Sequence, residues 1–211
     1  MLRLTLPLAS ALAAGLLMDG LGMPQVQPAP NGTWVPFTAR YTETSTSRDS
    51  AGHQTNQQVA IVETRSKDGS LLSVRSENGQ VTSGSLWDSC GQMFSLDYLQ
   101  KRAVLSRQAP REHTKMPSAP PTGTQTVAGV SCLVYPIRGA VAGTTCHDVV
   151  NDIPLRIEWH MNSGRVQQNY QKELTSIDFA TPVDASMVSI PAGFTKLVPD
   201  SGSPLGCAAK K

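Results

Sequence analysis

The fold class is decided by the stretch Ile153-Pro-Leu-Arg-Ile-Glu-Trp-His-Met161. From Leu155 onward every second residue is apolar, and the residues between them are charged or polar. Successive residues of a strand point to opposite faces, so this pattern predicts a strand with one face against an apolar interior. The turn residues Asn162-Ser-Gly164 follow, and residues 166–179 are expected to return as a long antiparallel strand.

Two cysteines lie upstream of this strand, in residues 131–146, where the simplest hairpin folds about Gly139. That register sets Cys132 directly opposite Cys146, within the reach that a disulfide requires. We therefore predict a Cys132–Cys146 bond, which would contribute about 3 kcal/mol on the chain-entropy account. Two free buried thiols are the alternative.

The first half of the chain shows the same strand character, with alternating apolar residues and many β-branched ones. The expected strands cover residues 37–47, 57–66, 70–76, 80–87, 93–97 and 102–107. Asn78-Gly79 separates two of them and is a strong short hairpin signal. The first half is therefore predicted to be an antiparallel meander.

Helix signals are few. Thr181 and Pro182 are suited to the N-cap and first position of a short helix over residues 183–189. Residues 108–124 contain four prolines and are expected to form a surface loop rather than a central strand. About ten antiparallel strands with one or two short helices must curve to bury one face, which predicts a mainly β fold, an incomplete half β-barrel.

The chain opens like an exported protein. Residues 1–23 combine a charged start with an apolar run of signal-peptide length, although an uncleaved membrane anchor is the alternative. Residues 24–36 are expected to be a linker, 37–195 a single domain and 196–211 a flexible tail. No cysteine precedes Cys90, so the sequence has no N-terminal lipoprotein attachment site. A secreted or periplasmic location is therefore expected.

Export permits disulfides, and Cys90 and Cys207 remain as a second pair by elimination, although a free Cys207 is equally compatible with the sequence. The formal net charge is +2 and charged residues make up 16% of the chain. This balance gives no electrostatic footprint for nucleic acid or for an acidic membrane surface. We expect no nucleic-acid partner and only an indirect association with membranes.

The order of these pieces resembles the superfamily of periplasmic and outer-membrane lipoprotein carriers, the LolA-like and LppX-like proteins. The resemblance is carried by the strands Phe37-Thr-Ala-Arg-Tyr-Thr-Glu43, Val130-Ser-Cys-Leu-Val-Tyr135 and Ile153-Pro-Leu-Arg-Ile-Glu158, and by the closing Met187-Val-Ser-Ile-Pro-Ala-Gly-Phe194. It spans roughly residues 37–195. It implies an incomplete antiparallel barrel that holds acyl chains in its concave face.

The chain departs from that family at two places. A proline-rich linker stands where the carriers have a helix before the first strand. The family's lid-contacting arginine lies in a Trp-x-x-Arg-Pro context, and its nearest counterpart here is Arg65 in Glu63-Thr-Arg-Ser66, without the tryptophan or the proline.

No nucleophile, phosphate-binding or metal motif is present in the sequence, so we expect a protein that is not an enzyme and has no cofactor. In a strand, the neighbours Cys146-His147-Asp148 cannot converge on one ion. His147 is expected on the solvated polar face opposite Arg156. A weak surface metal site of His147 with Glu158 and His160 is a minor alternative.

The apolar strand residues are the candidate contacts for a ligand, although an ordinary core uses the same residue types. They are Val59, Ile61, Leu72, Val74, Leu155, Ile157, Trp159, Met161 and Tyr170. Few helices are available to cover a large sheet, so an uncovered apolar face would need a ligand or a partner.

The sequence therefore favours an exported, non-catalytic envelope protein that binds a hydrophobic small molecule, a lipid or an acyl chain, in the concave face of a curved sheet. The alternative is a structural or protein-interaction module of the cell envelope that uses the sheet edge or the 108–124 loop to meet a protein partner.

Overall fold

The computed structural model describes residues 34–108, 119–164 and 166–198, which form one sheet of twelve strands. The strands are β1 (Phe37–Asp49), β2 (Gln54–Arg65), β3 (Leu71–Glu77), β4 (Gln80–Trp87), β5 (Gln92–Asp97), β6 (Arg102–Gln108), β7 (Gly123–Val127), β8 (Val130–Ile137), β9 (Ala142–Asp148), β10 (Ile153–Asn162), β11 (Val166–Asp178) and β12 (Thr195–Leu197). The expected signal peptide and most of the linker, the proline-rich loop and the tail lie outside the described residues.

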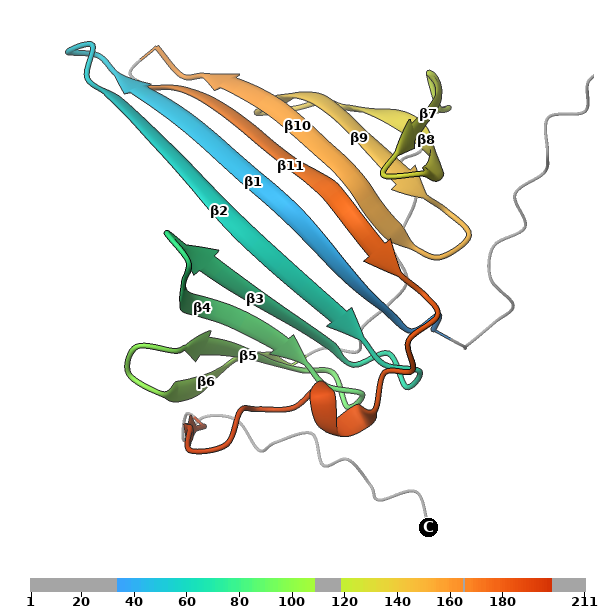
Figure 1. The fold of residues 1–211 in the computed structure, drawn as a ribbon. Helices are drawn as coiled ribbons and strands as arrows, with labels where there is room; N and C mark the ends of the chain where they lie inside the picture. The colour runs from blue at the N-terminus through green and yellow to red at the C-terminus, as the bar shows by residue number, and fades with distance from the viewer. Residues whose placement is uncertain (1–33, 109–118, 165, 199–211) are drawn as a thin grey trace, which may run out of the picture.

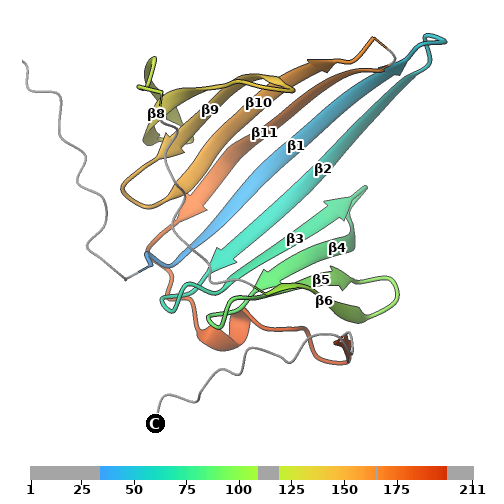
Figure 2. The same ribbon diagram turned by 180° about the vertical axis from the view of Figure 1, so that it is seen from behind.

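The strand order is β12-β6-β5-β4-β3-β2-β1-β11-β10-β9-β8-β7. Pairing of β1 with β11 joins two antiparallel meanders, β1–β6 and β7–β11, and β12 adds to β6 in parallel. Among the described strands, the edges β7 and β12 do not pair with each other, so the curved sheet stays open (Figures 1 and 2). The predicted mainly β, incomplete barrel is confirmed, with β7 and β12 raising the strand number above ten.

The predicted turns form where the residues tolerate a positive φ. Asn78 and Gly79 have φ of 51° and 79° between β3 and β4, as expected of an Asn-Gly hairpin. Asp152 has φ of 55° in the turn between β9 and β10. Asn162 accepts a hydrogen bond from the Gly164 amide in the turn between β10 and β11.

The Cys132–Cys146 disulfide is confirmed, with the two Cα atoms 5.4 Å apart. The register of its hairpin differs from the expected one, because Cys146 lies opposite Val134 rather than opposite Cys132. The cysteines are thus offset along their strands. Cys90 is also disulfide-bonded, whereas its proposed partner Cys207 lies outside the described residues.

The two faces of the long strands differ in character. We call the side that carries the cross-strand pair Tyr41 and Ile61 the Tyr41 face. The opposite side, which carries the pair Thr44 and Gln171, is the Thr44 face. Strand alternation assigns the remaining residues of β1, β2, β10 and β11 to one face or the other.

The first apolar cluster has the Tyr41 face at its centre and includes residues of β8 and β9. Its members are Phe37, Ala39, Tyr41, Val59, Ile61, Val127, Cys132, Val134, Cys146, Ile153, Leu155 and Leu174. Leu155 and Ile153 in this cluster are completely buried. The apolar side of residues 153–161 is therefore, at its beginning, part of an ordinary packed core.

A second cluster lies on the Thr44 side of β3–β6, where the chain after β11 crosses the shorter strands (Figure 1). Its buried members are Leu86, Phe94, Leu96, Ala103, Leu105 and Val188. Phe194 meets Tyr98 edge to face, with ring centroids 5.1 Å apart. The segment after β11 therefore acts as a partial second layer for this half of the sheet.

In this crossing segment the structure differs from the sequence prediction at the short helix and at the start of the tail. The helix is only the 3-10 turn η1 (Ala185–Met187), capped by Asp184, whose carboxylate accepts from the Ser186 amide at 2.8 Å. Thr181, the predicted cap, instead donates its hydroxyl to Asp178. Residues 196 and 197, expected in the flexible tail, belong to β12 and pair with β6.

A buried arginine fastens the sheet at the end of β2. Arg65 is 1% exposed and donates to the carbonyl oxygens of Val35, Asn151 and Asp152. Its Nε lies 2.8 Å from the Val35 oxygen and its Nη1 lies 3.2 Å from the Asp152 oxygen. These bonds join β2 to the turn between β9 and β10, two strands beyond its own neighbour β1.

Two aromatic rings complete the surroundings of this guanidinium. Its central carbon lies 4.5 Å from the ring centroid of Phe37 and 5.1 Å from that of Trp34. Such cation–π contacts strengthen when the cation is withdrawn from water. The resemblance to the carriers singled out Arg65 as the nearest counterpart of an arginine that meets a lid, and here it meets a turn of its own sheet.

We expect Arg65→Met to lower the free energy of unfolding by about 3–5 kcal/mol, because three buried carbonyl oxygens would lose their charged donor. Urea denaturation of the mature protein measures this change. Arg40→Met, on the exposed side of β1, is the matched control and should stay within about 0.5 kcal/mol of wild type. Equal urea midpoints for the two variants would show that Arg65 does not hold the sheet.

Candidate functional site

The nine predicted ligand contacts do not share one face. Val59, Ile61 and Leu155 are buried in the first apolar cluster. Further along the same face, the half-buried residues are Ile157, Trp159, Met161 and Tyr170. Leu72 and Val74 point to the Thr44 side, because they pair with Thr64 and Val62. The role of all nine residues as ligand contacts stays a prediction.

Polar groups occupy the middle of the Tyr41 face, where the sequence analysis expected apolar lining. Glu43 lies between Arg75, which forms a two-pronged ion pair with it, and Tyr170. The Tyr170 hydroxyl donates to Glu43 Oε2 at 3.0 Å. Its ring stacks on Trp159 with centroids 5.0 Å apart. We call Glu43, Arg75 and Tyr170, with the pair described next, the Glu43 network.

The second pair of the network is Lys172 and Glu63, with Nζ to Oε1 at 2.6 Å. The same ammonium lies 4.3 Å from the ring centroid of Tyr41. The Tyr41 hydroxyl is buried and has no hydrogen-bond partner among the described residues. Sequence reasoning missed this network, although a signal was present: Glu43, Glu63 and Lys172 fall at the same strand phase as Tyr41 and its apolar neighbours.

The network shifts the pKa values of its members. Burial alone would raise the pKa of the Glu43 carboxyl, but the hydrogen bonds and charges of Arg75, Tyr170 and Lys172 outweigh it and lower that pKa. Burial, followed by the Glu43 carboxylate, raises the pKa of Tyr170. Burial also raises the pKa of Tyr41, and Glu63 adds to the effect. At neutral pH Glu43 is therefore ionised and both tyrosines keep their protons.

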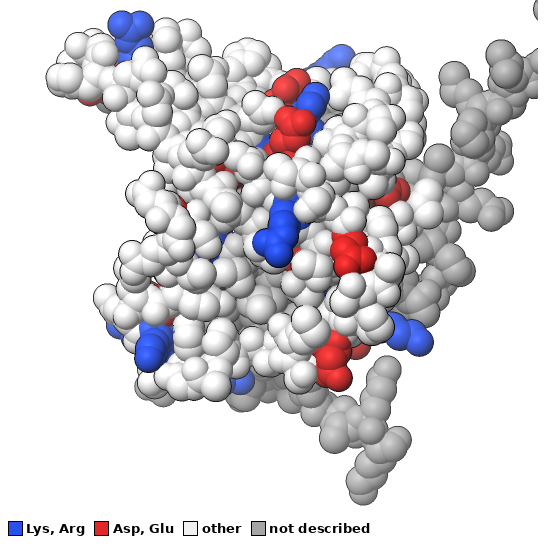
Figure 3. All heavy atoms as spheres, viewed as in Figure 1, with Lys and Arg blue, Asp and Glu red and all other residues white. Residues whose placement is uncertain are grey.

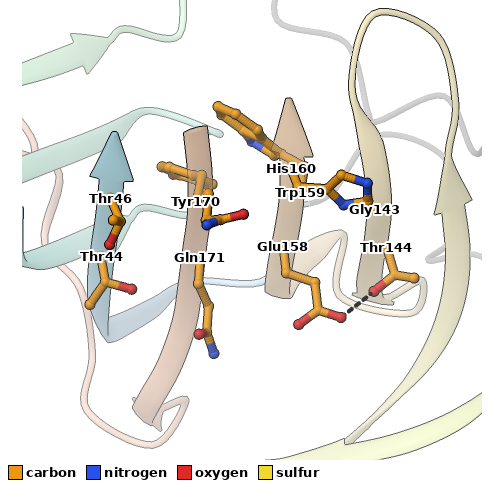
Figure 4. A pocket seen from close by; sticks show the side chains of 10 residues that line it. Thr44, Thr46, Gly143, Thr144, Glu158, Trp159, His160, Tyr170 and Gln171 are labelled. Atoms are coloured by element: carbon orange, nitrogen blue, oxygen red, sulfur yellow. Dashed lines mark hydrogen bonds between the residues drawn. The ribbon is translucent and has the colours of Figure 1, made fainter. Parts of the chain in front are cut away.

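A hollow of about 490 Å³ opens on the Thr44 face (Figure 4). We call it the polar hollow. Its lining residues come from β1, β9, β10 and β11 and are Thr44, Thr46, Gly143, Thr144, Glu158, Trp159, His160, Asn169, Tyr170 and Gln171. By strand alternation the Trp159 and Tyr170 side chains belong to the other face, so the side chains that project into the hollow are polar.

The strand register arranges these side chains in two rows. One row runs across the strands as Thr44, Gln171, Glu158 and Thr144, and the other as Thr46, Asn169 and His160. Neighbours within a row are about 5 Å apart, and the rows are about 7 Å apart. The Thr144 hydroxyl donates to Glu158 at 2.9 Å, as Figure 4 shows.

Gly143 allows the close approach of β9 to β10 at the edge of the polar hollow. A Cβ atom at this position would lie 2.0 Å from the Glu158 carbonyl oxygen, closer than any side chain permits. The glycine therefore keeps Thr144 beside Glu158.

The position of His147 differs from the expected one on the solvated polar face. His147 is 4% exposed rather than solvated, lies opposite Pro154 rather than Arg156, and its Nε2 is 3.0 Å from Asp152 Oδ1. A bulge at Pro154 and Arg156 shifts the register and turns the ring inward. His160 and Glu158 lie in the polar hollow, and the described residues contain no group of three or more His, Cys, Asp or Glu side chains suited to a metal ion.

No protein-family model matches the sequence, and no curated protein matches it. Solved structures do show similarity. An uncharacterized conserved protein from Thermus thermophilus has a TM-score of 0.48 and 11% identity, over 76% of this chain and 91% of that chain. The Pseudomonas aeruginosa MucA/MucB complex contains a chain with a TM-score of 0.44 and 12% identity, over 74% of this chain and 56% of that chain.

A LolA superfamily protein from Nitrosomonas europaea has a TM-score of 0.34 and 7% identity, over 77% of this chain and 92% of that chain. The part of the chain that the structure describes holds no helix with the length and apolarity needed to cross a membrane.

Because the pKa of Glu43 is lowered in the folded protein, part of the free energy of unfolding depends on pH. Because the unfolded chain binds this proton more readily, the stabilisation present at neutral pH is lost as the pH falls through the ordinary carboxyl range and below. We expect Glu43→Gln to be less stable than wild type at neutral pH, and to lose less free energy of unfolding on acidification.

Urea denaturation at about pH 7 and about pH 3 measures this difference. Glu77→Gln, on β3, is the control: among the described contacts Glu77 accepts a side-chain hydrogen bond from Gln57 and acts on Arg75 through its charge, without an ion pair like that of Glu43. It should lose as much stability in acid as wild type. An equal acid loss in Glu43→Gln and wild type would contradict the assignment.

Proposed function

We propose that this chain is an exported, non-catalytic binding module of the cell envelope that recognises its partner on the open surface of its sheet. The observation that carries the proposal is the division of the sheet: its buried apolar strand residues belong to two clusters within the chain, whereas its hollow is lined by polar side chains. In the view of Figure 3, charged side chains are scattered singly or in small groups over a surface that is mostly uncharged.

Export is supported by the leader-like residues 1–23 and by the Cys132–Cys146 disulfide, since such bonds persist in oxidising compartments. The assignment as a binding module is supported by the Glu43 network. The pKa values of Glu43 and Tyr41 are shifted, as those of catalytic groups often are, yet both side chains lie on the opposite face from the polar hollow, where Glu43 pairs with Arg75 and Tyr170.

A hydrophobic ligand is the second candidate, and one observation favours it. Ile157, Trp159 and Met161 continue the Tyr41 face beyond the buried Leu155, and they are only half-buried. An acyl chain lying along them would extend the first apolar cluster and remove their remaining apolar surface from water.

Native mass spectrometry of the mature protein from its own envelope fraction separates the two candidates. We expect either the bare mass or a complex with a partner, and no bound material that a denaturing organic extraction removes as lipid. The partner is held on a polar surface, so organic solvent should not recover it.

A lipid mass that Met161→Gln abolishes would replace our proposal by the second candidate. Leu99→Gln is the control for that substitution, because Leu99 is an apolar side chain 63% exposed at the turn between β5 and β6. Lipid lost equally from both variants would count as non-specific adhesion and leave our proposal in place.

A further inference from the structure

We propose that the polar hollow binds a neutral, hydroxyl-rich chain of the oligosaccharide class. This inference rests on the proposed function and gives the partner its chemistry. The hollow of about 490 Å³ falls within the size range of small-molecule sites, roughly 300–1,000 Å³. It lies open on the sheet, so a longer ligand can extend past it.

The hydrogen-bonding groups of the hollow determine the ligand class. Hydroxyls of Thr44 and Thr46 can donate and accept, and so can the amide of Asn169. The amide nitrogen of Gln171 donates to Glu173 at 2.7 Å, and its oxygen can accept from a ligand. A sugar hydroxyl has the same dual capacity and can satisfy such groups in pairs. Hydrogen bonds within the described chain leave the side chains of Thr44, Thr46 and Asn169 available to a ligand.

The charges argue against ionic ligands. No lysine or arginine lines the hollow, so it lacks the donors that select a phosphate or carboxylate. Its one carboxylate, Glu158, already accepts from Thr144 and is a single charge, fewer than a divalent cation requires. A neutral ligand therefore fits these residues best.

The two rows give the ligand a direction. Because Thr44, Gln171 and Glu158 stand at successive strands, an extended ligand would run across the strands and meet one row along each edge. An extended peptide, by contrast, pairs its backbone with a sheet edge, and the hollow lies in the middle of the sheet.

The test uses the mature protein and a panel of neutral oligosaccharides, with uronic-acid and amino-sugar oligosaccharides as charged counterparts. We expect at least one neutral oligosaccharide to bind. Calorimetry should then show binding weakened roughly five- to tenfold by Asn169→Ala and by Gln171→Ala, since each removes hydrogen bonds to the ligand. Gln58→Ala is the matched control: it is an exposed amide on the same face, opposite Thr44 on β2, outside the lining.

Binding of charged oligosaccharides alone, or of none, would overturn the inference. So would a neutral ligand whose affinity is unchanged in the double variant Asn169→Ala, Gln171→Ala, provided that its urea midpoint matches wild type. Failure of the saccharide site can be told apart from failure of the proposed function. A protein partner that the double variant still captures in native mass spectrometry would leave the binding module standing and remove the saccharide site.

Discussion

Arg65 is the constraint on which the curvature of the sheet depends. Its guanidinium sits at the end of β2 and donates to the turn between β9 and β10, across the two long strands that separate them. Withdrawing a cation from water is costly unless it is fully paired. Here three carbonyl oxygens and two aromatic rings provide the compensation, and two of those oxygens, from Asn151 and Asp152, come from across β1 and β11.

The curvature of the sheet also accounts for the Glu43 network. A bent sheet with few helices leaves its central face partly without a second layer, and long side chains fill that space. Lys172 lies over the Tyr41 ring while its ammonium meets Glu63, so its aliphatic part covers apolar surface and its charge is paired. The network therefore stands in for part of the missing layer on this face.

The sequence predicted what depends on short-range periodicity. The alternation from Leu155, the Asn78-Gly79 turn and the paired cysteines were enough to predict ten of the twelve strands, the open curved sheet and one disulfide. It did not predict β7 and β12, because a five-residue and a three-residue strand at the edges are held by pairing with β8 and β6 rather than by their own pattern. The offset at Cys132 arises because Ile137 pairs with Gly143, so the hairpin is not centred on Gly139. The inward turn of His147 comes with a bulge at Pro154 and Arg156, and alternation reveals neither feature.

The candidate site was harder to predict, since it depends on which strands become neighbours. His160 and Asn169 face each other across a predicted hairpin and look like ordinary solvated positions, and only the pairing of β1 with β11 brings the distant Thr46 into their row. Alternation then couples this row to the other face: Tyr170 projects into the Glu43 network directly between Asn169 and Gln171, which project into the polar hollow. A backbone held in place by an ion pair on one side presents its hydrogen-bonding groups on the other side already ordered, which lowers the entropic cost of binding a flexible ligand there.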